Sequence, residues 1–293
     1  MGTISSTSSK WTAEGKHVLI TGASSGIGKE LARNFAERGA SLALLARSKD
    51  DLSEVAIECM ELGSPMAAIF LCDMTDDANL KESIESALEM FGRFDVIILN
   101  AGRSQGCYFE EIKDVDAISY MLKLNINGVI NTVFHLLPSV PKSSSSRIVV
   151  ISSVSGVIPV PYRTIYCASK HALVGFANSL RLELRDTYAK DSPVVQVINF
   201  PEVQGTKLNS GRMDFGADLP PAEFMIKDVI TVQEACALLM NKIAEGVREW
   251  GQPLKVKLLL PFWSVFPSIL DRIIIKAVKK THHRPDTARL GLY

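Results

Sequence analysis

Short apolar runs alternate with longer amphipathic segments along most of this chain. Several runs have the length and composition of buried strands, and they cover residues 17–21, 41–46, 67–71, 95–99, 147–152 and 194–200. Apolar residues recur at helical spacing between them, which predicts helices over 27–38, around 52–62, over 77–91, about 115–136 and about 164–188. This alternation favours an α/β fold with a doubly wound parallel sheet, a Rossmann fold, because right-handed crossovers place helices on both faces. A last strand is predicted at 254–260.

The length of the chain and the change of pattern near its ends indicate one domain with two appendages. A chain of 293 residues fits a single large α/β domain, which we place at 15–260. Residues 1–14 are expected to form a flexible tail, without the apolar segment of a secretory signal. The tail matches Met-Gly-x-x-x-Ser, so Gly2 is a candidate for N-myristoylation, with an unmodified tail as the alternative. Residues 261–293 form an apolar and amphipathic extension.

Composition and charge argue against several classes of function. Lys and Arg together number 32, as do Asp and Glu, so the net charge is zero and a general attraction to nucleic acid is not expected. The 5 cysteines are scattered along the chain, which predicts reduced packing residues in a cytosol-facing protein, not a disulfide framework. The 5 histidines show no ligand spacing, so we predict no metal site.

A glycine-rich segment, TGASSGIG, follows the first predicted strand and opens the first helix. Its glycines Gly22, Gly26 and Gly28 have the spacing Gly-x-x-x-Gly-x-Gly. Glycines allow a tight turn and a close approach to a pyrophosphate, and the helix N-terminus supplies free N–H groups and a positive dipole end. The segment therefore predicts a dinucleotide site; the alternative is a glycine-rich turn without function.

The residues that end the second strand indicate which dinucleotide binds. NAD-binding folds usually carry an acid there for the ribose 2′-hydroxyl, whereas an arginine accommodates a 2′-phosphate. This chain has Ala46 at that place, followed by Arg47 and by Ser48 as a second possible donor. The pattern favours NADP(H), with a solvated arginine as the alternative. Asp73 and Asn100 follow the third and fourth strands, at the sheet edge where ligands bind.

Tyr166 and Lys170 lie at i and i+4 on a predicted helix, so they share one face. A free phenol has a pKa of about 10. A nearby ammonium group is expected to lower that pKa toward the range useful for proton transfer. Ser153 ends the preceding strand and offers a donor to a substrate oxygen. Tyr-x-x-x-Lys alone is typical of many exposed helices, but with the serine and the glycine-rich segment it predicts an acid–base site.

These motifs together resemble the classical short-chain dehydrogenase/reductase family. The matching segments are TGASSGIG (21–28), NAG (100–102), NING (125–128), SS (152–153) and YCASK (166–170). The resemblance covers about residues 15–250 and implies that Tyr166 is the general acid/base and that Ser153 polarises the substrate carbonyl. It also implies that Lys170 binds the nicotinamide ribose and lowers the Tyr166 pKa, and that Asn125 holds a water in a proton relay to Lys170.

The resemblance also implies a set of cofactor contacts. They are Gly22, Ser24, Ser25, Gly26, Ile27, Gly28, Arg47, Ser48, Asp73, Asn100, Tyr166, Lys170 and, near the carboxamide, Thr206. Two positions depart from the family pattern. Leu99 stands where the family often has a second asparagine, and Glu202 follows Pro201 where a glycine is common.

The segment YCASKHALVGFANSLRLEL (166–184) is similar to a branch of membrane-associated reductases that includes dehydrogenase/reductase member seven and the hydroxysteroid dehydrogenases. This similarity implies an NADP(H)-dependent enzyme that transfers a hydride between nicotinamide and a carbonyl or alcohol of a lipophilic substrate, such as a steroid or retinoid. The alternatives are a 3-ketosphinganine-type lipid ketone reductase and a non-catalytic NADP(H)-binding protein of membrane surfaces. Family members pair through helices about 115–136 and 164–188, which implies a homodimer or homotetramer.

The C-terminal extension has the pattern of an interfacial helix. Beyond Pro267, a helix would place apolar residues on one face and basic residues on another; these are Ile269, Leu270, Ile273 and Ala277, and Arg272, Lys276, Lys279 and Lys280. The apolar run 258–270 is too short to span a bilayer. We therefore expect peripheral membrane contact on the cytosolic side, at the endoplasmic reticulum, the alternatives being a packing or dimer-contact helix and a cytoplasmic location.

Overall fold

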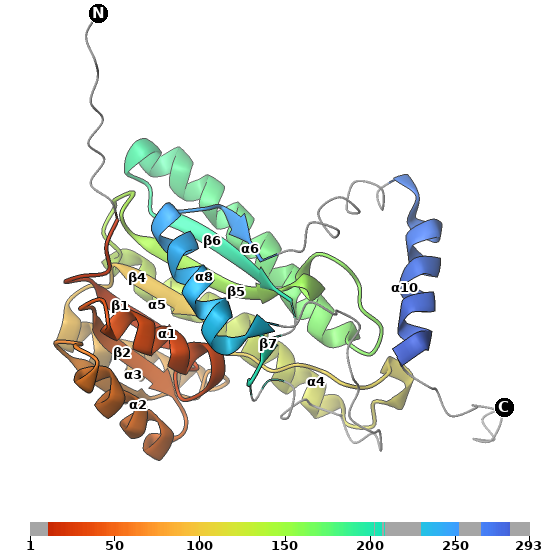
Figure 1. The fold of residues 1–293 in the computed structure, drawn as a ribbon, viewed down its shortest axis with the longest axis horizontal. Coiled ribbons are helices and arrows are strands. Elements are labelled where there is room, and N and C mark those ends of the chain that lie inside the picture. Colours follow the sequence, from red (N-terminus) through yellow and green to blue (C-terminus); the bar gives the residue numbers. More distant parts are fainter. Residues whose placement is uncertain (1–10, 202, 207, 209–229, 252–264, 282–293) are drawn as a thin grey trace, which may run out of the picture.

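The computed structural model describes residues 11–201, 203–206, 208, 230–251 and 265–281. Within them the chain has the predicted fold, a doubly wound α/β domain of the Rossmann type (Figure 1). Gly2, Glu202 and the strand predicted at 254–260 lie outside the described residues.

The centre of the domain is a parallel, 7-stranded sheet with the order β3-β2-β1-β4-β5-β6-β9. Its strands are β1 (His17–Thr21), β2 (Ser41–Ala46), β3 (Ala67–Leu71), β4 (Val96–Leu99), β5 (Arg147–Ser153), β6 (Val194–Phe200) and β9 (Glu249–Trp250). Two short strands, β7 (Val203–Gln204) and β8 (Ile230–Thr231), pair with each other. The predicted strands agree with β1 to β6 to within one residue at each end. The pattern did not predict β9, because two residues carry no measurable periodicity.

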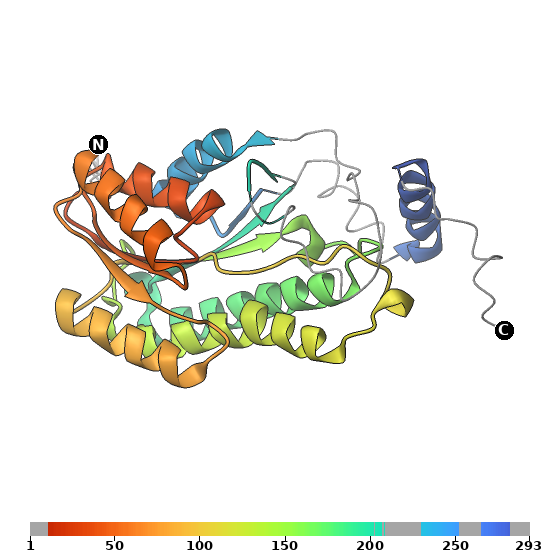
Figure 2. The same cartoon turned by 90° about the horizontal axis from the view of Figure 1, so that it is seen from below.

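Helices cover both faces of the sheet (Figure 2). They are α1 (Gly26–Ala36), α2 (Lys49–Glu61), α3 (Asp77–Phe91), α4 (Val115–Leu122), α5 (Gly128–Leu136), α6 (Thr164–Tyr188), α8 (Val232–Glu245) and α10 (Pro267–Thr281). Helices α1, α2 and α8 pack on one face, and α3, α5 and α6 on the other. Successive strand residues serve alternate faces, so Val18 and Ile20 of β1 belong to the first core and Leu19 to the second.

The helix predicted over 115–136 is continuous in extent but not uniform. Helices α4 and α5 are joined by a π-helical turn, Lys123–Asn127. Such turns insert one residue more than an α-helical turn and often occur at functional sites. The apolar pattern cannot reveal this turn, because the segments on either side of it keep ordinary helical spacing.

All five cysteines are free and buried, as the packing interpretation predicts. Burial raises the pKa of the Cys59 and Cys236 thiols to about 12 and that of Cys72 to about 11. A thiol with so high a pKa is almost wholly protonated near neutral pH, so these side chains serve packing and not nucleophilic chemistry.

Candidate active site

A cavity of about 570 Å³ lies at the carboxyl ends of the parallel strands. Segments that follow β1 to β6 contribute to its lining, and strand order reverses between β1 and β4, where ligands bind in sheets of this type. The cavity brings together every predicted catalytic and cofactor residue except two. Gly28 and Asn125 are not part of its lining and lie buried behind it.

The glycines of the turn after β1 are each required, two by their backbone angles and one by lack of space. Gly22 and Gly26 adopt left-handed backbone angles, with φ of +65° and +55°. A Cβ on Gly28 would lie 2.2 Å from the Gly22 carbonyl oxygen, so no side chain fits there. Ser25 makes no side-chain cap hydrogen bond to α1, and the first turn of α1 has no acidic residue. The turn therefore presents N–H groups and a positive helix end to the cavity, as an anion site requires.

Asn100, at the end of β4, holds the glycine-rich turn in place. Its Nδ2 lies 3.1 Å from the Thr21 carbonyl oxygen and 3.2 Å from that of Gly22, and donates to both. The Thr21 hydroxyl in turn accepts from the backbone N–H groups of Asn100 and Ala101, at 3.0 and 3.1 Å. The ends of β1 and β4 are thus tied together on the cavity floor, a role the motif NAG alone does not specify.

The side chains expected near the adenosine half also line the cavity. Arg47 is exposed, and its Nη1 donates to the Tyr120 hydroxyl at 3.0 Å. Ser48 caps α2 with its hydroxyl. Burial acts to raise the pKa of Asp73, but hydrogen bonds from Thr75 and the Arg47 charge outweigh it and hold that pKa below its ordinary value. Asp73 is therefore a firmly ionised acceptor.

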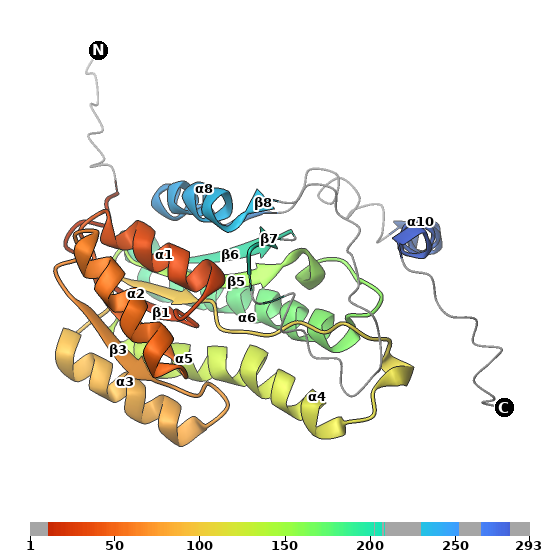
Figure 3. The ribbon, with the colours of Figure 1, turned by 60° about the horizontal axis from the view of Figure 1, so that its bottom comes forward.

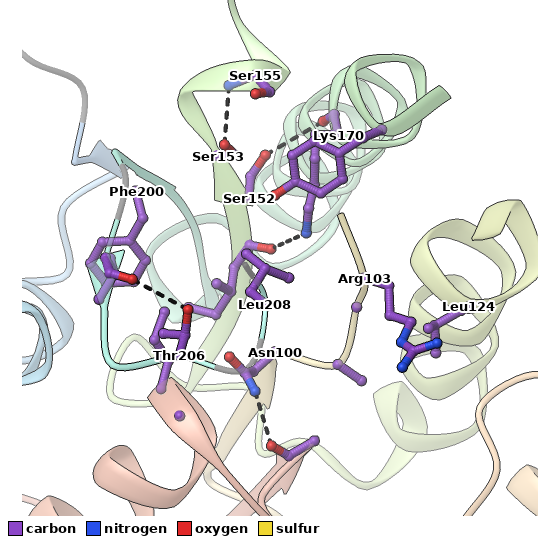
Figure 4. A pocket seen from close by; sticks show the side chains of 18 of the residues that line it. Asn100, Arg103, Leu124, Ser152, Ser153, Ser155, Lys170, Phe200, Thr206 and Leu208 are labelled. Atoms are coloured by element: carbon purple, nitrogen blue, oxygen red, sulfur yellow. Dashed lines mark hydrogen bonds between the residues drawn. The ribbon is translucent and has the colours of Figure 1, made fainter. Parts of the chain in front are cut away.

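The acid–base residues meet on the opposite wall of the cavity. Tyr166 and Lys170, on α6, are 2% and 4% exposed. The Lys170 Nζ donates to the Ile151 carbonyl oxygen at 2.9 Å and lies 5.7 Å from the centroid of the Tyr166 ring. Ser153 ends β5, where its Oγ accepts from the Ser155 N–H at 3.1 Å, and Figure 4 shows Lys170 reaching toward the same strand end. The i, i+4 spacing thus placed both helix residues correctly.

The electrostatic expectation for this pair was wrong for the tyrosine. Burial raises the pKa of Tyr166, and the Arg163 charge and a hydrogen bond with Ser153 lower it only in part. Burial also lowers the pKa of Lys170 to about 8. Both shifts have the same physical origin, because each removes a charged form from water. Spacing alone predicted that the Lys170 ammonium would lower the Tyr166 pKa, whereas burial has the larger effect and raises it.

Two further residues near the tyrosine were not predicted. Arg163, 8% exposed, lines the cavity with its guanidinium carbon 5.7 Å from the centroid of the Tyr166 ring. It stands at i−3 from Tyr166, a spacing that identifies neighbours on a helix and that could have revealed it. Gln105 contacts the start of α6 from a distant segment, and no sequence signal indicates that contact.

Asn125 ends up inside the protein rather than on the cavity surface. It lies in the π-helical turn and is fully buried. Its Oδ1 accepts from the Arg103 N–H at 2.9 Å, and its Nδ2 donates to the Arg103 carbonyl oxygen and to the Ser169 hydroxyl, at 2.9 and 3.0 Å. A Cβ on Gly102 would lie 3.1 Å from that Oδ1 and 3.7 Å from the Lys170 Nζ. Asn125 is therefore close to Lys170, and the water relay stays a prediction.

The remaining lining is largely apolar. Residues 158–161, between β5 and α6, contribute to it, as do Leu124 and Leu208. Thr206 borders the glycine-rich turn, where a Cβ on Gly26 would be 3.5 Å from its own Cβ. Ile274 of α10 also reaches this cavity. Helix α10 lies at the end of the molecule where β5 stops and α6 begins (Figure 3), so the C-terminal extension contributes to the site.

Within the described part of the chain, no group of three or more His, Cys, Asp or Glu residues has an arrangement that could hold a metal ion. None of the helices described has both the length and the apolar character needed to cross a bilayer.

Comparison with known proteins agrees with this geometry. The family model of short-chain dehydrogenases matches residues 16–208. The 11-beta-hydroxysteroid dehydrogenase-like 4A of Arabidopsis thaliana is 32% identical over 262 residues, which cover 87% of this chain and 82% of the relative. The 11-beta-hydroxysteroid dehydrogenase A of Sesamum indicum is 30% identical over 258 residues, covering 88% and 74%.

Two solved structures are similar in fold. An alcohol dehydrogenase from the archaeon Thermococcus sibiricus, complexed with 5-hydroxy-NADP, has a TM-score of 0.68 and 27% identity, over 82% of this chain and 96% of that one. A short-chain dehydrogenase/reductase from Burkholderia phymatum in complex with NAD has a TM-score of 0.75 and 21% identity, over 89% and 96%. The chain belongs to the short-chain dehydrogenase family, as its motifs predict, and it is an oxidoreductase that uses a nicotinamide dinucleotide.

Proposed function

We propose that the chain is an NADP(H)-dependent oxidoreductase that interconverts a carbonyl and an alcohol on a lipophilic substrate of the steroid or retinoid kind. The observation that carries the proposal is the meeting of Ser153, Tyr166 and Lys170 in the same cavity as the glycine-rich turn. A dinucleotide site and a buried phenol with a hydroxyl partner are the two parts that such a reaction needs.

The residues present fit a phosphorylated dinucleotide. Gly28 has no room for a Cβ, and the adjoining N-terminus of α1 carries no acid, which suits a pyrophosphate. Arg47 would contact a 2′-phosphate, since Ala46 leaves no carboxylate at the usual place for a 2′-hydroxyl partner. Asp73 and Thr206 would border the adenine and the carboxamide. These features support NADP(H) over NAD(H).

The protein's own residues would supply the proton and stabilise developing charge. Bound NADPH supplies the hydride, and NADP⁺ accepts it in the reverse reaction. Tyr166 would donate its phenolic proton to the substrate oxygen as that oxygen gains negative charge. Ser153 would donate a hydrogen bond to the same oxygen, and preorganised donors of this kind stabilise a transition state. The Lys170 ammonium and the Arg163 guanidinium would keep positive charge near the phenol as its proton leaves.

The substrate half of the cavity supports a lipophilic substrate. Its wall at 158–161 is Ile-Pro-Val-Pro, and Leu124, Leu208 and Ile274 add further apolar surface. A small number of polar groups within an apolar lining is typical of sites that orient an apolar ligand at one reactive atom. The relatives named as hydroxysteroid dehydrogenases agree with this class, and a sphingoid ketone is a second candidate that a substrate panel would separate.

The outer face of α10 supports peripheral membrane contact on the cytosolic side, with the endoplasmic reticulum as our proposed location. Leu270 is buried, whereas Phe266, Ile269 and Ile273 are about half exposed, at 50%, 57% and 52%. Arg272 is also exposed, so the helix leaves both apolar and basic side chains open to solvent, the two kinds of group with which interfacial helices contact a bilayer. A homo-oligomer is supported by a different surface: Phe134 of α5 is exposed and apolar, on a helix through which family members pair.

The first test is turnover by wild type and by Tyr166→Phe. Wild type should consume NADPH with at least one ketone in a panel of steroids, retinoids, quinones and sphingoid ketones, followed by NADPH absorbance. Tyr166→Phe removes only the acidic oxygen, so kcat should fall on the order of a hundredfold or more while NADPH still binds. Full activity in that variant would refute the proton-transfer role.

A further inference from the structure

The helix that carries the acid–base tyrosine begins without a cap from its own sequence. Arg163 is the N-cap residue of α6 and makes no side-chain cap hydrogen bond. The Oε1 of Gln105 accepts instead from the backbone N–H of Ile165 at 2.8 Å and from that of Tyr166 at 3.3 Å. These are the second and third N–H groups of the helix, which an N-cap side chain ordinarily satisfies. The cap is therefore supplied by a residue 61 positions away from Tyr166.

Hydrogen bonds from the amide nitrogen of Gln105 fix the orientation of its carboxamide. Gln105 is fully buried. Its Nε2 donates to the Cys107 carbonyl oxygen at 3.0 Å and to the Thr164 hydroxyl at 3.3 Å. Because both N–H donors of the carboxamide are used, its oxygen is left to accept from the Ile165 and Tyr166 N–H groups. The contacts to Thr164, Ile165 and Tyr166 join the segment after β4 to the first turn of α6, and the contact to Cys107 holds Gln105 within its own segment.

We propose that Gln105 is a positioning residue for the proton transfer, because it fixes the helix backbone at the residue that carries the phenol. The inference rests on the acid–base role proposed for Tyr166. Lys170 lies one turn further along and is anchored separately to Ile151. Loss of the cap would therefore let the first turn shift relative to Lys170 and Ser153, and so would move the phenol out of register with its partners.

A second contact joins the same two segments and is independent of Gln105. The hydroxyl groups of Tyr108 and Tyr162 are 2.7 Å apart, and their ring centroids are 4.0 Å apart. Tyr162 has a φ of +67°, a left-handed backbone conformation that non-glycine residues seldom adopt. The chain entering α6 is thus held at Tyr162 as well, which favours folding of variants at Gln105.

The test compares three substitutions that differ in where they place an acceptor oxygen. Gln105→Glu keeps an oxygen at the same reach from the backbone, whereas Gln105→Asn shortens the reach by one methylene and Gln105→Leu removes the acceptor. Gln196→Leu is the matched control: Gln196 is also fully buried, and its Nε2 donates to two backbone carbonyl oxygens, of Lys242 and Val247, outside the cavity. Each variant is measured for kcat, KM, NADPH affinity and thermal unfolding.

We expect kcat to fall by about tenfold to a hundredfold in Gln105→Leu and Gln105→Asn, because a misplacement of about 1 Å has effects of that size. Gln105→Glu keeps the acceptor oxygen but loses the amide donors to Cys107 and Thr164, so its kcat should fall less than that of Gln105→Leu; NADPH affinity should stay within about twofold in all three. Gln196→Leu should lower thermal stability with little change in kcat. The proposal is overturned if Gln105→Asn turns over like wild type, or if kcat falls equally in Gln105→Leu and Gln196→Leu.

A readout without substrate separates this proposal from the proposed function. Phenolate absorbance, taken as the difference between each protein and its Tyr166→Phe counterpart, follows the titration of Tyr166 alone. Because burial raises the pKa of that phenol, a displaced first turn should let it titrate at lower pH in Gln105→Leu and Gln105→Asn. Wild type without turnover on any substrate would refute the proposed function, whereas an unchanged Tyr166 titration in both variants would refute the positioning role of Gln105.

Discussion

At the scale of single residues, burial sets the protonation of the groups at the catalytic end of the cavity. Tyr166 and Lys170 both lie out of water, and burial raises the pKa of the first and lowers that of the second. If the same two residues were exposed on a helix, water would stabilise the phenolate and the ammonium group, and burial would not shift their pKa values. The consequence is measurable as a dependence of stability on pH.

Lys170→Met tests the sign of this effect. The pKa of Lys170 drops from its ordinary 10.5 to about 8 in the folded protein. Between these values the unfolded chain binds the proton and the folded protein does not, so folding becomes more favourable as pH rises through the window. The unfolding free energy of wild type, measured against that of Lys170→Met, should therefore increase from about pH 8 toward 10.5. Lys81→Met, at an exposed lysine, is the control. If the difference in unfolding free energy between wild type and Lys170→Met did not change with pH, the lowered pKa of Lys170 would be contradicted.

Arg47→Ala tests the choice of cofactor. Arg47 is exposed at the cavity rim, where its guanidinium would pair with a 2′-phosphate. Its removal should weaken NADPH binding by about tenfold, a value reduced by solvent screening, and leave NADH binding nearly unchanged. Dissociation constants from nucleotide fluorescence provide the measurement. The control is Arg93→Ala, because Arg93 precedes the start of β4, away from the cavity; this variant should bind both nucleotides like wild type. Equal losses of NADPH and NADH affinity in Arg47→Ala would rule out the NADP(H) preference.

Sequence could predict the site residues whose relations are local. Tyr166 and Lys170 share a helix face at four-residue spacing, and the glycines mark their own turn. Gln105 could not be predicted as a cap, because its partner is 61 positions along the chain and only the fold brings the two together. The raised pKa of Tyr166 was missed for a related reason: spacing gives the neighbours on one helix but not the burial produced by other elements.

At the scale of elements, two helical glycines have opposite surroundings. Gly28 opens α1 where a Cβ would strike the Gly22 carbonyl oxygen at 2.2 Å. Gly175, in the middle of α6, has nothing within 4 Å of an added Cβ. The first glycine is required by packing, and the second only leaves the unfolded chain more flexible.

Substitution of each glycine by alanine should have effects of opposite sign. Gly175→Ala should stabilise the protein by about 0.5–1 kcal/mol, as expected for an exposed helix interior. Gly28→Ala should destabilise it by about 1–3 kcal/mol, because the backbone must move to relieve the contact, and should abolish NADPH binding. Chemical denaturation and nucleotide titration measure the two effects. A Gly28→Ala protein with normal stability and affinity would be incompatible with the described turn.

Strands β1 to β6 and helices α3 and α6 agree closely with the predicted elements. Helix α8 was not predicted, although its buried apolar residues recur at helical spacing. The short strands could not be predicted, because two residues are too few to show an alternation of apolar and polar positions. Strand β9 is two residues long, and β7 pairs with β8 over two residues. Helix α10 was predicted as amphipathic, but the pattern did not indicate which of its apolar residues are buried and which are exposed. Leu270 is buried and Ile274 lines the cavity, whereas Ile269 and Ile273 are exposed.

At the scale of the whole molecule, α10 connects the proposed membrane contact to the site. One part of its apolar surface lies against the cavity and another faces outward. Such an arrangement would place the cavity close to the bilayer that dissolves a lipophilic substrate. The oxidoreductase chemistry itself does not depend on this, so the two proposals fail separately.

Binding to liposomes tests the outward face of α10. The full-length chain should sediment with vesicles that contain anionic lipid and less with neutral ones, because apolar insertion and basic residues act together. Replacing Ile269 and Ile273 by Ser should reduce sedimentation severalfold while leaving NADPH binding intact. Ile57 of α2, 54% exposed, supplies the matched control, and Ile57→Ser should bind like wild type. A full-length chain that stays in the supernatant with every vesicle would exclude membrane contact through α10.

The π-helical turn at Lys123–Asn127 has a consequence for how this chain tolerates length changes. Helix α4 packs against α6, and α5 packs against α3. The continuous helical segment formed by α4, the π-helical turn and α5 therefore uses a different face on each side of the turn. Deleting a single residue from the turn would restore ordinary helical winding, at a rotation of about 100° between the two halves. Either Asn125 would leave Arg103 and Ser169, or α5 would leave α3. A one-residue gap here should therefore be far more harmful than a gap of the same size in residues 141–146, the loop that leads into β5.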